Sequence, residues 1–308
     1  MGKINNKSLT EIAIAAFIIF VAIFAINGSS AQAAQSTVNL GTAAPFAILS
    51  GTPNITDAGN ASVIQGDVGL SPATGAGIGL LCSQVTGTIY SVDAAGPLPC
   101  RITDAPLLTT AKSNLTTAYT DASGRIPVTT VPTELGGTTL VGGVYDSAST
   151  TFEITAGAGP LVLDGLNDAS SVFIFNMGFD GTGLTVGPSS TVTFINEAQA
   201  CNVFWRVDTA TIDTAANFKG TILALNSITV ADGATIEGRL LAQNGNVTLI
   251  NDTITVPVCV DNDTTDNTIP GLPNTGSASA NLLWVIVPSA VVLGILVLAY
   301  LARKKHLI

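Results

Sequence analysis

Short apolar runs separated by glycine, asparagine and aspartate make up most of the chain. Ala47-Ile48-Leu49 and Ser62-Val63-Ile64 are two such runs near the start, and residues 138–256 continue the pattern. Short runs of apolar and β-branched residues between turn residues are typical of β-strands. We therefore predict a mainly β fold.

One segment has a helical period instead. Asp104 can cap a helix, Pro106 suits its first turn, and Gly124 can end it. The apolar positions between them fall on one face of a helix: Leu108, Ala111, Leu115, Ala118, Tyr119 and Ala122. This pattern predicts a helix over 104–123 that packs against a long wall. The preceding residues 71–102 are rich in glycine, proline and alanine, and we expect a loop-rich cap there.

The last part of the β region is periodic. The segment 218–224 recurs 18 residues later as 236–242, and Thr253-Ile254 continues the step. Ser62-Val63-Ile64-Gln65-Gly66 resembles the same unit far upstream. A period of this length without a helix in the unit predicts a solenoid with one turn per repeat and three faces, with Ile, Leu, Val and Ala inside. The alternative is a β-sandwich with coincidental similarity between strands.

Both ends of the chain carry an apolar segment. Ile12–Ile26 follows two lysines and precedes Ala31-Gln32-Ala33, a pattern that predicts a secretory signal peptide over 1–33. The second apolar segment, 282–302, is long enough to cross a bilayer of about 30 Å. It is followed by Arg303-Lys304-Lys305, which is expected to stay on the cytoplasmic side.

The pentapeptide Leu272-Pro273-Asn274-Thr275-Gly276 precedes the second apolar segment. Together with that segment and the basic tail, it resembles the LPxTG cell-wall sorting signal, over residues 272–308. The resemblance implies that a sortase cleaves between Thr275 and Gly276 and joins Thr275 to peptidoglycan. An ordinary C-terminal membrane anchor is the alternative. The polar residues 257–271 are expected to form a short solvated linker.

The predicted mature chain, 34–275, is strongly acidic. Removal of the two ends leaves six of the 11 basic residues and 20 of the 21 acidic ones, for a net charge of −14. Nucleic acid needs clustered Lys and Arg, so we expect no nucleic-acid partner. The only histidine, His306, lies in the removed tail. We therefore expect no imidazole-based catalysis, no metal site and no cofactor.

Four cysteines in an exported chain favour two disulfides. Of the three possible pairings, Cys82–Cys100 and Cys201–Cys259 are preferred, because the first two cysteines are close in sequence. A zinc site is the poorer alternative, since the sequence has no C-x-x-C spacing.

Several segments, in order and spacing, resemble the bacterial and fungal ice-binding proteins of the DUF3494 type. They are 44–49, 66–72, 171–175, 200–205, 220–225 and 238–242, so the resemblance covers residues 38–256, nearly the whole predicted domain. It implies a right-handed, three-faced, discontinuous β-solenoid over 34–256, with one long α-helix packed alongside and a small cap.

The resemblance also implies a flat face that binds ice, in part through T-A/G-x-T/N motifs. The segment 214–217 matches the motif in full, from Thr214 to Asn217. One repeat later, the glycine and Thr235 are kept, and in the next repeat only Thr253 is kept. Asp232, Ile250 and Asp252 depart from the motif, which implies an imperfect grid. Four further candidates are Thr191 and Ser62, which extend the ladder, and Thr182 and Thr185, which form a matching motif outside the period.

Two other classes of function compete with ice binding. A wall-anchored adhesin could bind polysaccharide or a cell surface, but Trp205 is the only tryptophan of the mature domain and lies in an expected core strand. An enzyme would need clustered carboxylates, and the local cluster of Asp261, Asp263 and Asp266 lies in the linker. We therefore expect a monomeric, non-enzymatic cell-surface protein whose partners are ice, sortase and peptidoglycan.

Overall fold

The computed structural model describes residues 35–177, 181 and 183–260. The predicted signal peptide, residues 261–271 of the linker, the sorting pentapeptide and the predicted span 282–302 lie outside these residues. Within the described part, no helix has both the length and the apolarity needed to cross a bilayer.

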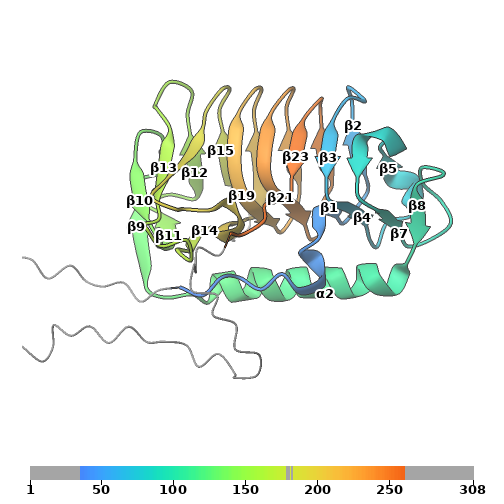
Figure 1. Cartoon of the computed structure of the whole chain (residues 1–308), viewed down its shortest axis with the longest axis horizontal. Coiled ribbons are helices and arrows are strands. Elements are labelled where there is room, and N and C mark those ends of the chain that lie inside the picture. The colour runs from blue at the N-terminus through green and yellow to red at the C-terminus, as the bar shows by residue number, and fades with distance from the viewer. Residues whose placement is uncertain (1–34, 178–180, 182, 261–308) are drawn as a thin grey trace, which may run out of the picture. The chain divides into compact units, whose positions relative to one another are not determined.

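The described residues form a β-solenoid with three faces, and all strand pairs are parallel (Figure 1). The helix face contains β8 (Arg101–Thr103), β7 (Ile89–Ser91), β4 (Asp67–Leu70), β1 (Phe46–Ser50), the second halves of β21 (Thr235–Ala242) and β19 (Asn217–Ala224), β17 (Val203–Val207), β14 (Phe173–Met177), β11 (Gly143–Ser147) and β9 (Val128–Val131). The threonine face contains β12 (Thr151–Ile154), β15 (Gly183–Val186), β18 (Thr209–Ile212), β20 (Ile228–Val230), β22 (Val247–Leu249), β2 (Ile55–Asp57) and β5 (Ile78–Gly79). The third face is called the strap face, after residues 256–260, which border it. It contains β10 (Thr139–Val141), β13 (Leu161–Asp164), β16 (Val192–Ile195), the first halves of β19 and β21, β23 (Thr253–Thr255), β3 (Val63–Gln65) and β6 (Val85–Thr86).

Strands β19 and β21 each serve two faces and turn a corner at a glycine. Gly220 has φ +109°, and a Cβ there would lie 2.7 Å from a methyl carbon of Val203. A Cβ on Gly238 would lie 1.9 Å from the carbonyl oxygen of Gly220. Only glycine fits these two positions, because the two backbones approach closely at the corner.

The inside of the solenoid is an apolar core with an aromatic stack. Trp205 is fully buried, and its ring stacks on Phe175 with centroids 3.8 Å apart and an interplanar angle of 7°. Phe152 and Phe218 pack around the same ring. The indole N–H donates to the carbonyl oxygen of Lys219 at 3.0 Å. The expectation that Trp205 lies in the core is confirmed.

The predicted helix is confirmed as α2 (Ala105–Ser123). Asp104 is its N-cap and accepts a hydrogen bond from Leu107 N at 2.9 Å. All six predicted apolar positions are buried. They pack against outward side chains of the helix face, such as Phe204 and Leu223, and form a second apolar core outside the solenoid. Figure 1 shows α2 lying along this face.

The coils do not stack in chain order. Strands β1, β2 and β3 pair with β21, β22 and β23, so the first coil lies against the last one. Beyond β4, strands β5, β6 and β7 add a further turn, and α2 then runs back to β9 at the other end (Figure 1). The discontinuous solenoid is thus seen directly.

The region 71–102, expected to be a loop-rich cap, is rich in loops but also adds short strands to the solenoid. That region contains β5, β6, β7 and the start of β8, together with the 3₁₀ turns Gly75–Gly77 and Cys82–Gln84. Two further 3₁₀ turns lie elsewhere, at Gly41–Ala43 and Ala200–Asn202. Strands of two or three residues are too short to show the alternation by which a strand is recognised.

Two buried carboxylates accept hydrogen bonds where the first coil meets the last. Asp57 accepts hydrogen bonds from Ser62 N at 2.9 Å and Asn251 N at 3.1 Å, and from the Gln84 amide. Asp252 accepts from Ala234 N at 2.9 Å and from Ile250 N at 2.8 Å. These bonds satisfy backbone N–H groups at the turns that enter the strap face.

The pKa values of these two carboxyl groups are shifted in opposite directions. Burial, followed by the charges of Asp57 and Asp232, raises the pKa of Asp252 to about 6. Burial also acts on Asp57, but the hydrogen bonds from Ser62, Asn251 and Gln84 leave the pKa of that carboxyl below its usual value of 3.8.

Asp252 is therefore expected to make the protein less stable as pH rises from 4 to 6. Its folded-state pKa lies above the unfolded value of 3.8, so its stabilising contribution is complete below pH 4 and is lost above pH 6. The difference between these two pKa values of Asp252 corresponds to at most about 3 kcal/mol in the free energy of unfolding. Urea unfolding between pH 4 and 7 measures this slope, and Asp252→Asn should flatten it. Glu197→Gln, at an exposed carboxylate, should leave the slope unchanged; equal slopes in all three proteins would contradict the assignment.

Candidate functional site

A ladder of threonines runs along the middle of the threonine face. Thr185 pairs with Thr211, Thr211 with Thr229, Thr229 with Thr248, and Thr248 with Thr56. Each of the five lies between two inward-facing residues of its strand, so its side chain points outward. The five side chains therefore project at the same level from five adjacent coils.

A second row of small side chains flanks this ladder. Thr151 pairs with Gly183, and Gly183 pairs with Thr209. Each lies two residues along its strand from the row of the threonine ladder, which we call the main row. Glu153 occupies the main row at the end coil, and Gly79 occupies it at the opposite end. Among the described strands of this face no position is Lys or Arg. The threonine face is thus regular and bears little charge.

The ladder predicted from the 18-residue period lies on a different face, the strap face. Asn217 pairs with Thr235, and Thr235 with Thr253, as the period predicts. Thr191 joins the same ladder through a bridge to Asn217. The stacking of these four residues is confirmed; their role in binding remains a prediction.

One predicted member of the ladder, Ser62, and one departure from the motif, Asp252, both face the interior. Val63, not Ser62, pairs with Thr253, because strand residues alternate between faces. Ser62 is 1% exposed, and its hydroxyl accepts a hydrogen bond from Asp252 N at 2.9 Å. The prediction for Ser62 is therefore wrong: this side chain faces the interior. Asp252 likewise points inward, so it does not interrupt a surface grid.

The remaining candidates fall elsewhere. Thr185 belongs to the threonine face, whereas Thr182 lies outside the described residues. Thr214 is exposed at the corner between the threonine and strap faces. Its carbonyl oxygen accepts a hydrogen bond from Ser189 N, and Ala215 N donates to the carbonyl oxygen of Asp232 in the next coil. The T-A-x-N motif thus forms the turn that joins the two faces.

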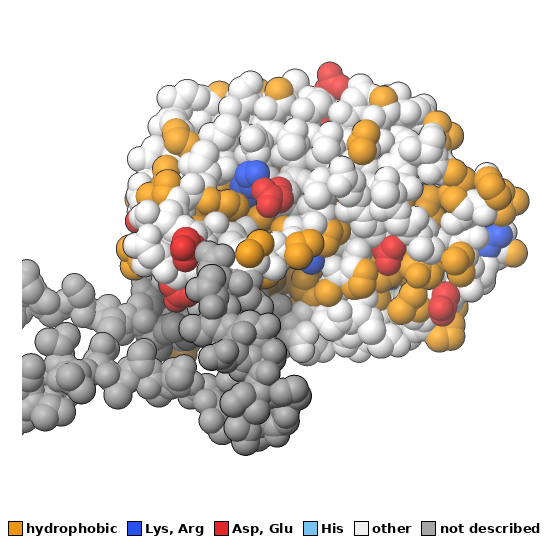
Figure 2. Space-filling view, viewed as in Figure 1, with side chains coloured by type: hydrophobic (Ala, Val, Ile, Leu, Met, Phe, Trp, Pro, Cys, Tyr) orange, Lys and Arg blue, Asp and Glu red, His pale blue; other side chains and the backbone are white. Residues whose placement is uncertain are grey.

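The strap face differs from the threonine face because it carries an ion pair and is bordered by a further segment of the chain. Beside its ladder, Lys219 and Glu237 form an ion pair at 2.7 Å, at paired positions of β19 and β21. Figure 2 shows a basic side chain beside an acidic one on the visible surface. The segment Val256–Val260, which we call the strap, leaves β23 and borders a groove lined by Lys219, Thr235 and Glu237. This face is consequently neither neutral nor flat.

Four residues of the threonine ladder were not predicted from the sequence. They are Thr56, Thr211, Thr229 and Thr248, each placed between two buried residues of a short strand. The step from Thr211 to Thr229 is 18 residues, but the step from Thr229 to Thr248 is 19. A single threonine between two apolar residues, repeated at nearly the solenoid period, is the signal that could have found them.

The predicted disulfide pairing is confirmed. Cys82 pairs with Cys100, and Cys201 pairs with Cys259, each with Cα atoms 5.6 Å apart. The described residues contain no group of three or more metal-ligating side chains.

Comparison with known proteins places this geometry among ice-binding proteins. The family model described as Ice-binding-like matches residues 48–255. The ice-binding protein of Flavobacterium frigoris is 41% identical over 235 residues, which cover 75% of this chain and 80% of that protein.

Two solved structures are similar as well. One is an ice-binding protein from an Antarctic biological consortium, with 34% identity, a TM-score of 0.63 and coverage of 74% of this chain and 94% of the other. The other is the DUF3494 domain of Shewanella frigidimarina ice-binding protein 1, with 28% identity, a TM-score of 0.65 and coverage of 74% and 100%.

Proposed function

Because the chain belongs to the ice-binding-like protein family, we propose that it binds ice through the threonine face. The observation that carries this proposal is the row of Thr185, Thr211, Thr229, Thr248 and Thr56, which stand in unbroken register on five adjacent coils.

The spacing of this face explains how it would act. Outward residues two apart along a strand are about 6.7 Å apart, and adjacent coils are about 4.8 Å apart. Threonine is stiff at χ1 and presents a methyl group beside a hydroxyl. A rigid array of such groups can hold a layer of ordered water that merges with an ice lattice. Charged side chains would orient that water differently, so a face with few charges suits the task.

Partitioning into slowly growing ice tests the proposal. The protein should be enriched in the ice fraction over the remaining liquid, whereas an unrelated acidic protein of similar size should be excluded. Equal exclusion of both proteins would contradict ice binding. Enrichment on a polysaccharide matrix instead would favour the adhesin alternative, which no described contact supports, because Trp205 is buried.

We further propose that the protein acts on the cell surface, as a monomer and without catalysis or a cofactor. The support is the sequence of both termini: a signal-peptide pattern at the start, and Leu272–Gly276 with an apolar segment and basic tail at the end. The last described residue, Val260, ends the strap and does not lie on the threonine face. A tether from this point would leave the threonine face open to ice.

Thr275→Ala should move the protein from the cell-wall fraction to the membrane fraction. Sortase joins the threonine carbonyl to the wall, so its substitution should leave the chain held only by its C-terminal segment. Cell fractionation followed by immunoblotting measures this. Asn274→Ala, at the variable position of the motif, is the control and should stay in the wall; wall attachment of Thr275→Ala would contradict sorting.

A further inference from the structure

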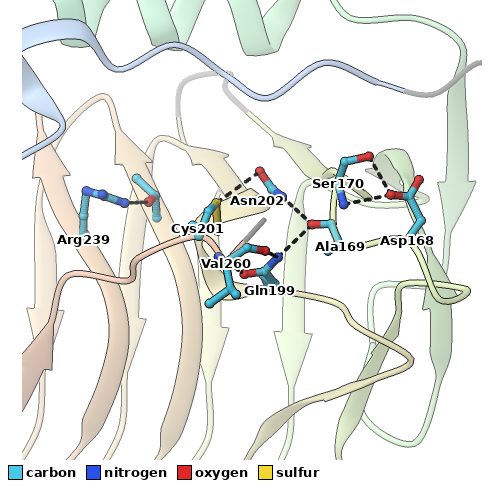
Figure 3. Close-up of a disulfide and its surroundings, with 10 residues drawn as sticks. Asp168, Ala169, Ser170, Gln199, Cys201, Asn202, Arg239 and Val260 are labelled. Carbon is cyan, nitrogen blue, oxygen red and sulfur yellow. Dashed lines mark hydrogen bonds between the residues drawn. A yellow bond between two sulfur atoms is a disulfide. The ribbon is translucent and has the colours of Figure 1, made fainter. Parts of the chain in front are cut away.

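The strap ends in two attachments on the same short turn. Cys259 is bonded to Cys201 of the 3₁₀ turn Ala200–Asn202. One residue later, Val260 N donates to Gln199 Oε1 at 2.7 Å, and Gln199 Nε2 donates to the carbonyl oxygen of Val260 at 2.9 Å. Figure 3 shows Cys201, Gln199 and Val260 gathered at this point. The final described residues are therefore held covalently and by a pair of hydrogen bonds.

The turn that receives the strap is itself tied to a neighbouring coil. Gln199 Nε2 also donates to the carbonyl oxygen of Ala169 at 3.0 Å, and Asn202 Nδ2 donates to the same oxygen at 3.1 Å (Figure 3). Asn202 is 6% exposed. The turn continues directly into β17, whose Trp205 is stacked in the core. A force applied at Cys201 would thus be shared by two coils and the aromatic core.

The strand before the strap is held by hydrogen bonds and packing alone, without a covalent link. β23 has three residues, and it alone joins β21 to β3 on the strap face. Its backbone bonds, such as Thr253 N to Ala234 O at 2.9 Å, run from coil to coil, as does the strap. Tension along this direction would open the hydrogen bonds one after another. Loss of β23 would separate the first coil from the last on that face.

We infer that the Cys201–Cys259 disulfide, with Gln199, is a mechanical clamp that passes tension from the C-terminal tether to the start of β17 and shields β23 from it. This inference rests on the proposed tethering of the domain. A cell held to ice pulls on residues beyond Val260, and the clamp makes this pull bypass the seam between the first and last coils.

Single-molecule pulling tests the clamp. The full chain, purified in detergent, is held by a tag after Ile308 and pulled through a handle on an azide-bearing residue that replaces exposed Thr209 in β18. In the double variant Cys201→Ser, Cys259→Ser, an early low-force event should release residues 251–260, about 35 Å of chain. The wild type should lack this event. The matched control Cys82→Ser, Cys100→Ser removes the other disulfide and should behave as the wild type.

Reduction of folded wild-type protein on the instrument provides a second measurement if the double variant folds poorly. Reductant should produce the early event in the wild type and in the Cys82→Ser, Cys100→Ser control alike. The clamp is overturned if the early event occurs in oxidised wild type, or if neither the double variant nor the reduced protein shows it. The pull uses no ice and no cell wall, so failure of the proposed function would show separately, as absent ice partitioning or absent sorting.

Discussion

Thr229→Tyr is expected to abolish most of the thermal hysteresis of the protein. Thr229 is the middle member of the threonine ladder, paired with Thr211 on one side and Thr248 on the other. A phenol ring at this point would stand above the neighbouring methyl and hydroxyl groups and keep the face from meeting a flat lattice. Because Thr229 is exposed, the free energy of unfolding should change by no more than about 0.5 kcal/mol. Nanolitre osmometry and urea unfolding measure the two effects.

Thr235→Tyr is the matched control, since it makes the same exchange in the same kind of ladder on the strap face. Thr235 lies beside the ion pair of Lys219 and Glu237, so we expect this variant to keep nearly all of its hysteresis. If Thr235→Tyr loses hysteresis while Thr229→Tyr keeps it, ice binds to the strap face, at the ladder of Asn217, Thr235 and Thr253. Loss in both variants would indicate a surface that extends around the corner at Thr214.

Trp205→Ala should have the largest effect on stability. The fully buried indole is stacked on Phe175 and contacts Phe152 and Phe218 from the other sides. Its removal leaves a cavity inside the solenoid that the strands cannot close, and truncations of this kind cost about 3–5 kcal/mol. Equilibrium urea unfolding should show an earlier midpoint.

Trp205→Phe separates ring packing from the indole hydrogen bond. Phenylalanine keeps an aromatic ring against Phe175 but cannot donate to the carbonyl oxygen of Lys219. We expect a loss of about 1–2 kcal/mol, clearly smaller than for alanine. If alanine and phenylalanine were equally costly, the hydrogen bond rather than the stack would hold this region together.

Two periods in the sequence were sufficient to predict most of the architecture. The apolar positions of 104–123 place α2 because a helix buries residues three and four apart. The 18-residue step places Asn217, Thr235 and Thr253 in one ladder, because each repeat turns its corner at the same point. Predicted export and an even count favoured two disulfides, and the closeness of Cys82 and Cys100 in sequence favoured the pairing that the structure has.

Other features depend on register and neighbours that the sequence does not display. Alignment of the upstream repeat on Gly66 would have placed Val63 in the ladder; the choice of the polar Ser62 put the ladder position one residue away. The threonine face was missed because its strands are short and its period changes from 18 to 19 residues at the turn before Thr248. The sequence does not show that the Lys219–Glu237 pair and the strap lie on the same face of the solenoid. Only the structure shows that the threonine face is the less charged of the two.

Single ice crystals grown in a solution of the purified wild-type protein test whether the protein binds ice through a flat surface. Binding should arrest growth on the bound planes, so the crystals should become faceted and a gap should open between the melting and freezing temperatures. Crystals that grow as round, unfaceted discs, with melting and freezing at the same temperature, would contradict ice binding.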